Sequence, residues 1–166
     1  MGEITVREAR PGDAAGIARC HVDSARYYIE LAPELFRMPA EEGLVEFVEP
    51  KGSLPDDHLE IVAEIDGEIA GHLEARLEHP LESARFQIVS EVGETRLFIN
   101  ALATAEPFKR KGVATGLVEA AEEWGRERGA TSAFLDTWVE SPSSVPFWEE
   151  RMGYDRRSII FRKPLR

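Results

Sequence analysis

Three consecutive basic residues, Lys109, Arg110 and Lys111, stand directly before Gly112 and an amphipathic segment that begins at Val113. We expect this segment to be a helix. The first backbone N–H groups of a helix have no partner inside it, so they point at whatever precedes the helix. Gly112 has no Cβ, which lets a bulky anion approach the backbone. The combination predicts a phosphate site, with pyrophosphate as the best match.

One short glycine-containing turn is by itself a weak motif. The turn lacks the Gly-Lys-Ser/Thr ending of the Walker sequence, and Gly112 and Gly116 are not followed by the third glycine of the dinucleotide fingerprint. An ordinary strand-to-helix connection with solvated basic side chains is therefore a second interpretation.

The chain as a whole is acidic, with a formal net charge of -11 over 166 residues. This charge disfavours binding to nucleic acid, and it either attracts cationic small molecules or serves only solubility. The length fits a single domain over residues 1–166. No apolar run reaches ~18 residues and no secretory signal is visible, so we expect neither a membrane span nor export. The single cysteine, Cys20, fits a reducing cytoplasm.

Hydrophobic periodicity predicts the elements that position the basic turn. Strands are expected at 4–8, 58–65, 68–77, 95–104, 131–139 and 158–162. Helices are expected at 14–25, 27–36, 113–128 and 145–152, with one or two further turns within 40–49. Asp13 is the expected N-cap of the first helix, and Asp66-Gly67 predicts a tight hairpin. Residues 78–93 fit either an extra strand or a helical turn. His21 stands alone on the first helix, where a histidine is usually a core-edge or surface residue.

The basic turn and its flanks resemble the GCN5-related N-acetyltransferase (GNAT) superfamily. Lys109-Arg110-Lys111-Gly112-Val113-Ala114 is similar to the family's (Gln/Arg)-x-x-Gly-x-(Gly/Ala) signature, and Leu102-Ala103-Thr104 is similar to the strand end before it. Phe147 to Tyr154 is similar to the closing Phe/Leu-Tyr-x-x-x-Gly-Phe segment, and Ile4 to Asp13 is of the family's opening type.

The resemblance implies an α/β (α+β) fold, the GNAT acyl-CoA N-acyltransferase fold. It has a mixed central sheet of six to seven strands flanked by about four helices. The strand that ends at Thr104 would splay from the strand that ends at Val139, and the pantetheine arm of acetyl-CoA would lie in that gap. The residues implied to contact the cofactor are Leu102, Ala103, Thr104, Lys109, Arg110, Lys111, Gly112, Val113, Ala114, Thr115, Ser141 and Trp148.

The implied reaction is direct attack of a primary amine on the thioester. An ammonium ion cannot attack, so a base or a desolvating pocket must supply the neutral amine. Asn100 stands where many relatives carry an acidic residue, and an amide cannot be a base, although it could bind substrate or hold a water. His72 and Glu74 on the neighbouring strand are the candidate bases, and Glu78 and His79 are weaker ones.

Trp148 stands where the family often has the Tyr that protonates the leaving thiolate, and Ser141 stands where Asn is common. An indole N–H donates a hydrogen bond but is not a useful acid. The thiolate is a fair leaving group, since a free thiol has a pKa of ~8.5. Ser141 and Ser144 are either proton donors or simple helix caps.

Tyr27 and Tyr28 lie where the family builds its acceptor wall, so they are either substrate contacts or core. We therefore expect a cytoplasmic N-acetyltransferase that uses acetyl-CoA, no metal, and an amine of a small molecule, an amino-acid derivative or a protein. The family often forms homodimers. Two alternatives remain: a non-catalytic acyl-CoA-binding module, and an unrelated α/β domain with an incidental basic loop.

Overall fold

The computed structural model describes residues 2–165 in two compact units, Met1–Asp136 and Thr137–Arg166. The first unit is built on a five-stranded sheet of order β1-β2-β3-β4-β5. The first four strands are antiparallel neighbours, and β5 runs parallel to β4. The strands are β1 (Thr5–Glu8), β2 (His58–Ile65), β3 (Glu68–Glu78), β4 (Arg96–Thr104) and β5 (Ser132–Phe134).

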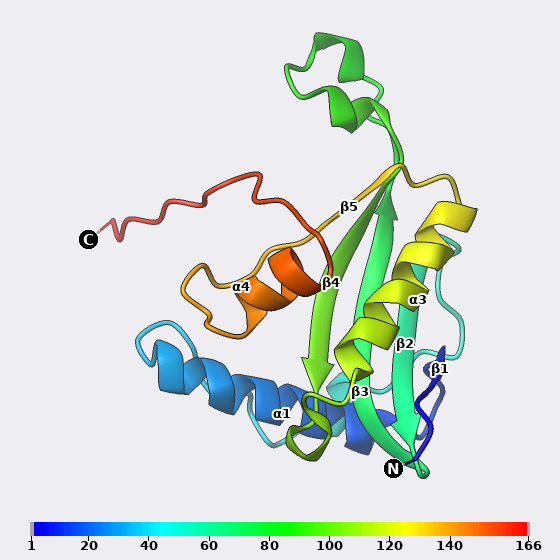
Figure 1. Cartoon of the computed structure of the whole chain (residues 1–166), viewed down its shortest axis with the longest axis vertical. Helices are drawn as coiled ribbons and strands as arrows, with labels where there is room; N and C mark the ends of the chain where they lie inside the picture. Colours follow the sequence, from blue (N-terminus) through cyan, green and yellow to red (C-terminus); the bar gives the residue numbers. More distant parts are fainter. Residues whose placement is uncertain (1, 166) are drawn as a thin grey trace. The chain divides into compact units, whose positions relative to one another are not determined.

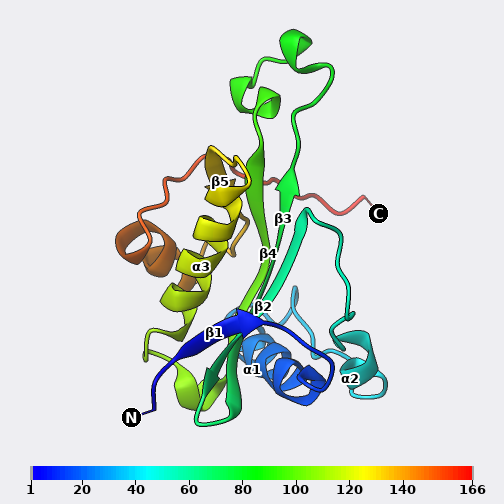
Figure 2. The same ribbon diagram turned by 90° about the vertical axis from the view of Figure 1, so that its right-hand side faces the viewer.

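Two long helices, α1 (Ala14–Leu31) and α3 (Val113–Glu127), cover opposite faces of this sheet (Figures 1 and 2). Alternation along β3 separates the two faces. A Cβ added to Gly71 would lie 2.5 Å from Val113 of α3, whereas the next residue, His72, lies beside His21 of α1. The core on the α1 face includes Ile17, Cys20, Val62 and Ala105. None of the helices within residues 2–165 is both long and apolar enough to cross a bilayer.

Two predictions made from turn residues in the sequence are confirmed, the Asp66-Gly67 hairpin and the end of α3 at Gly129. Asp66 and Gly67 both have positive φ, of 50° and 82°, as a type I′ hairpin requires. Gly129 ends α3 at a φ of 83°, and its N–H donates to the carbonyl of Arg126. The expected strand over 58–65 has the bounds of β2.

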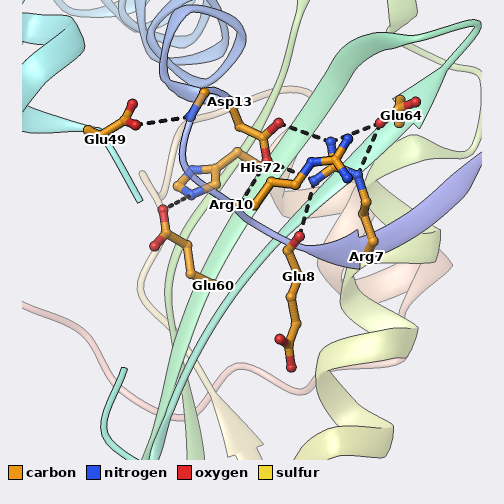
Figure 3. Close-up of polar contacts among 9 residues, drawn as sticks. Arg7, Glu8, Arg10, Asp13, Glu49, Glu60, Glu64 and His72 are labelled. Atoms are coloured by element: carbon orange, nitrogen blue, oxygen red, sulfur yellow. Dashed lines mark hydrogen bonds and ion pairs between the residues drawn. The ribbon is translucent and has the colours of Figure 1, made fainter. Parts of the chain in front are cut away.

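Asp13 precedes α1 as expected, but its side chain does not cap the helix. Its two oxygens accept hydrogen bonds of 2.7 and 2.9 Å from the guanidinium of Arg7, which also reaches Glu64 at 2.8 Å (Figure 3). The backbone N–H of Arg10 donates to the same carboxylate at 2.9 Å. The charge of Arg7 made it a stronger partner for Asp13 than the neutral helix N–H groups. The result ties the start of α1 to β1 and β2.

One predicted element of the first unit is wrong. A separate helix over 27–36 is not formed, because α1 continues without a break to Leu31, with Ala32 as its C-cap before Pro33. The one or two turns expected within 40–49 are confirmed as the single turn of α2 (Leu44–Phe47). Of the two alternatives for residues 78–93, the helical turn is confirmed and the extra strand is not, since this segment contains two 3-10 turns, Ala84–Phe86 and Ser90–Gly93, beyond the end of the sheet (Figure 2).

The second unit contains a short helical segment, made of α4 (Ser144–Pro146) and a π-helical turn, Phe147–Arg151. Gly153, at a φ of 75°, follows it as predicted. The expected strand over 158–162 was wrong. Within residues 2–165 this segment pairs with no strand, and Ile159, Ile160 and Phe161 are exposed. A strand requires a partner edge, and the apolar run alone does not supply one. The expected strand over 131–139 is shortened to β5. Because residues 158–162 add no strand, the sheet has five strands rather than six or seven.

Candidate functional site

The two strands β4 and β5 pair only at their beginnings. The three paired positions are Arg96 with Ser132, Leu97 with Ala133 and Phe98 with Phe134. β4 then continues to Thr104, whereas β5 ends at Phe134, and the two strands diverge (Figure 1). Within the first unit, the edge of β4 over residues 99–104 that faces away from β3 therefore has no strand partner. An extended ligand with amide groups can pair with such an edge as an added strand.

A β-bulge lies at the point where β4 leaves β5. Glu74 of β3 is opposite Ala101, but the next residue, Ala75, is opposite Ile99, so Asn100 is the extra residue on β4. A bulge bends its strand, increases the local twist and is frequent beside active sites. Asn100 is exposed. The sequence predicted a polar residue near the reaction centre at this position but gave no sign that it forms a bulge.

The loop after β4 presents backbone N–H groups at the start of α3. Arg110 and Gly112 both have positive φ, of 60° and 88°, and Gly112 immediately precedes the helix. Where left-handed residues alternate with right-handed ones, successive backbone N–H groups turn toward one side and form a concave anion site, called a nest. No side chain caps α3, and a Cβ on Gly112 would meet only Ile4, at 3.8 Å. Open space in front of the positive end of a 15-residue helix fits a pyrophosphate.

The three basic residues of this loop differ in their surroundings. Lys109 pairs with the Glu106 carboxylate, and its Nζ lies 5.2 Å from the ring centroid of Tyr27. Lys111 lies 5.3 Å from the ring centroid of Phe108, and Arg110 is exposed. The expectation that all three reach phosphate is untested. The structure adds that Tyr27, predicted as a substrate contact, lies beside Lys109 of this loop.

Four ionisable side chains meet on the α1 face, next to β4. Glu60 and Glu74 are directly opposite each other on β2 and β3, and His72 Nε2 lies 3.2 Å from an Oε1 of Glu60 and 3.8 Å from that of Glu74 (Figure 3 shows His72 and Glu60). The side chain of His72 is 1% exposed and that of Glu74 is 48% exposed. His21 of α1 adds a second imidazole, with its ring centroid 5.5 Å from that of His72.

The histidine on α1 is held in its neutral form. Burial, and to a smaller extent the neighbouring His72, lowers the pKa of His21 below its ordinary value. His21 is therefore uncharged at neutral pH. Glu74 is the most exposed of the four side chains, and it lies opposite Ala101 of β4, one strand spacing of ~4.8 Å away.

The predicted site residues of the second unit have structural partners within that unit. Ser141 is buried, and its Oγ accepts a 3.1 Å hydrogen bond from the N–H of Ser144, as a helix cap does. Trp148 is 8% exposed and packs edge-on against Phe147 and Tyr154. A cofactor contact by Ser141 or Trp148 stays a prediction. In the first unit, Tyr28 contacts the rings of Tyr27 and Phe36.

The sequence profile of the Acetyltransferase (GNAT) family matches residues 25–154, which is most of the chain. The chain belongs to this family. An uncharacterized N-acetyltransferase, YhdJ of Bacillus subtilis (strain 168), is 30% identical over 69 residues. That match covers 42% of this chain and 49% of YhdJ, so it spans about half of the relative's length.

Solved structures with the GNAT fold cover nearly the whole chain. A transcriptional regulator from Bacillus halodurans C-125 has a TM-score of 0.70 at 22% identity and covers 98% of this chain and 100% of its own. An aminoglycoside acetyltransferase, HMB0005, from an uncultured soil metagenomic sample has a TM-score of 0.62 at 23% identity, with 99% of both chains covered. At these identities the likeness shows the fold alone. The predicted GNAT fold is confirmed, with five strands in its sheet.

Proposed function

We propose that the protein transfers an acetyl group from acetyl-CoA to a primary amine by direct attack. The observation that carries the proposal is the order of two features along the chain: the open edge of β4, then the left-handed turn before α3. Acetyl-CoA carries its groups in the same order, with the thioester and pantetheine amides followed by the pyrophosphate. One extended ligand can therefore use the strand edge and the helix N-terminus together.

The cofactor would be held mainly by backbone groups. The exposed edge of Leu102, Ala103 and Thr104 would pair with the pantetheine amides, and the N–H groups from Lys109 to Thr115 would bind the pyrophosphate. A backbone N–H near Leu102 would stabilise the oxyanion of the tetrahedral intermediate. Because Trp148 is not an acid, the thiolate would leave without a proton from that position.

Glu74 is the best-placed base among the predicted candidates. Its carboxylate is half-exposed and lies opposite Ala101, next to the edge where the thioester would lie. The side chain of His72 is too buried to reach a substrate directly, so we assign it a positioning role beside Glu74. Asn100 is neutral and would bind the amine or a water.

We expect the acceptor to be a cationic amine, because Glu60, Glu74 and a net charge of -11 attract positive charge. Small diamines, amino-acid derivatives and peptide amines all satisfy this requirement. One structural neighbour is named as an aminoglycoside acetyltransferase, so amine-rich sugars belong in the same panel. We expect the protein to act in the cytoplasm, where acetyl-CoA is available.

The experiment is an amine panel with acetyl-CoA, in which the released thiol and the mass of the product are both measured. We expect at least one amine to gain an acetyl group, and Glu74→Gln to lower kcat by ~10²–10⁴-fold. Glu68→Gln, on the same strand but paired with Arg19, is the matched control and should keep the rate. Tight binding of acetyl-CoA without acetylation of any amine would favour the non-catalytic acyl-CoA-binding alternative.

A further inference from the structure

His21, His72 and Glu74 come together only in the folded chain. One ring nitrogen of each histidine and one carboxylate oxygen of Glu74 all lie within 4.8 Å of one another. His72 and Glu74 are two residues apart on β3 and so share a face of the sheet. His21 reaches them from α1, which packs on that face.

The imidazole of His72 has one nitrogen paired and one without a partner. Nε2 lies 3.2 Å from the Glu60 carboxylate, whereas Nδ1 is buried and has no hydrogen-bond partner among residues 2–165. Nε2 also lies 3.8 Å from the Glu74 carboxylate, so it is the nitrogen of His72 that faces the other side chains of the cluster. Nε2 is therefore the atom of His72 that would bind an ion there.

The charges around this ring also favour a cation. Glu60 and Glu74 lie directly opposite each other on β2 and β3, and like charges at such positions are destabilising. A divalent ion would offset that repulsion.

We propose that His21, His72 and Glu74 bind a divalent transition-metal ion, with the Glu60 carboxylate beside it. Two imidazoles and one carboxylate are the ligand set of open zinc sites, where a water takes the fourth position. Ca²⁺ and Mg²⁺ prefer sets made of oxygen alone. Ligands of tetrahedral zinc lie roughly 3.4 Å apart, given bonds of ~2.1 Å. Small rotations of the Glu74 and His21 side chains would bring the three ligand atoms from their present separation to this distance.

Metal binding does not depend on the transferase proposal, but one consequence does. A metal ion bound to Glu74 would occupy the carboxylate lone pairs that must accept the proton of the amine. Zn²⁺ should therefore inhibit acetyl transfer. That consequence rests on the proposed function. The test of binding is therefore made without substrate.

The full-length protein is freed of metal with a chelator and titrated with Co²⁺, whose absorption bands report tetrahedral coordination, and Zn²⁺ is then added as a competitor. We expect one ion per chain. The other two histidines provide the control, because His58 and His79 flank Asp57 at 2.8 and 3.6 Å on the surface and could bind an ion adventitiously. The double variant His58→Ala/His79→Ala should keep the cobalt spectrum.

Removal of a ligand should abolish the spectrum. His21→Ala is the principal variant, since His21 is only half-buried, and its fold is checked by circular dichroism. We expect at least a 100-fold loss of affinity for His21→Ala and His72→Ala, and a 10–100-fold loss for Glu60→Gln. The proposal is overturned if Co²⁺ does not bind below about 1 mM, or if binding survives in His21→Ala and disappears in the His58/His79 double variant.

Discussion

The backbone N–H of Glu106 donates a 2.8 Å hydrogen bond to an Oδ2 of Asp23, a buried side chain of α1. The preceding residue, Ala105, donates its N–H to the carbonyl of Ala70 on β3. The start of the proposed phosphate loop is therefore fixed to the helix on one side and to the sheet on the other. Asp23 is far from this loop in the sequence, and its carboxylate holds the loop at Glu106.

Replacing Asp23 by Ala should weaken both the fold and cofactor binding. The variant leaves the Glu106 N–H without its charged acceptor, which costs about 1.5–3 kcal/mol of unfolding free energy. Because the loop is then less well fixed, the Kd of acetyl-CoA should rise at least several-fold in calorimetric titration. The control is Arg26→Ala, which removes the other partner of Asp23 at an exposed position and should change stability by less than about 0.5 kcal/mol. Unchanged acetyl-CoA affinity in Asp23→Ala would refute the positioning role.

Gly112 and Gly129 form a matched pair for a test of the phosphate site. Both have positive φ, of 88° and 83°, and a Cβ at either would meet no atom closer than 3.8 Å. Substitution by Glu should therefore cost each variant the same ~1–2 kcal/mol of backbone strain. Only Gly112→Glu places a carboxylate where the pyrophosphate would lie, so it alone should lose acetyl-CoA binding. Equal affinities in the two variants would place the phosphates elsewhere.

The ion pair of Arg7 with Asp13 predicts a pH dependence of stability. The Arg7 guanidinium lowers the pKa of Asp13 in the folded protein, with its hydrogen bonds as the largest cause. Because the folded pKa lies below the unfolded value of ~3.9, this stabilisation is present above that value and is lost as the pH falls through the folded pKa. Asp13→Asn should be less stable at pH 7 by about 1–3 kcal/mol, with a smaller fall in unfolding free energy between about pH 5 and 3.

The pH measurement uses urea denaturation at a series of pH values. Asp56→Asn, at an exposed aspartate, should follow the wild-type curve. Parallel acid profiles for Asp13→Asn and the wild type would show that Asp13 has no part in acid destabilisation.

Cys20 should be unreactive in the native protein. It is fully buried on α1, and burial raises the pKa of its thiol to about 11. The thiolate is the reactive form, so a thiol reagent at pH 8 should label Cys20 only as fast as the protein opens. Labelling should become immediate in denaturing urea. Native labelling at the rate of a free thiol would mean that the packing of α1 on the sheet does not bury this residue in solution.

Local signals in the sequence predicted the central part of the fold. Asp66-Gly67 determines the hairpin turn because it supplies positive φ at both central positions, and this sets the register of β2 and β3. The amphipathic stripe of α3 predicted that helix. Gly112 before the stripe and Gly129 after it predicted where the helix begins and ends, and so where its uncapped N-terminus lies. The left-handed turn before α3, which we propose as the cofactor loop, was therefore visible in the sequence as a short-range pattern.

Features that depend on tertiary contacts were not visible. Asp13 accepts hydrogen bonds from Arg7 and not from the helix N–H groups, because a charged donor forms a stronger hydrogen bond than a neutral one. The apolar run at Ile159–Phe161 has strand propensity but no partner strand among the described residues. In the sequence His21 is an isolated histidine, expected at the core edge or the surface, and only the packing of α1 on β3 brings it to His72.

The central claim is that acetyl-CoA binds along β4 and on the N-terminus of α3, and thermal unfolding with and without acetyl-CoA tests it most directly. A ligand at ~100 times its Kd stabilises by about 2.7 kcal/mol, a shift in Tm of roughly 5–10 °C for a chain of this length. We predict this shift for the wild type and for Gly129→Glu, and none for Gly112→Glu. An unchanged Tm of the wild type at millimolar acetyl-CoA would contradict the claim, and the proposed transferase function would fall with it.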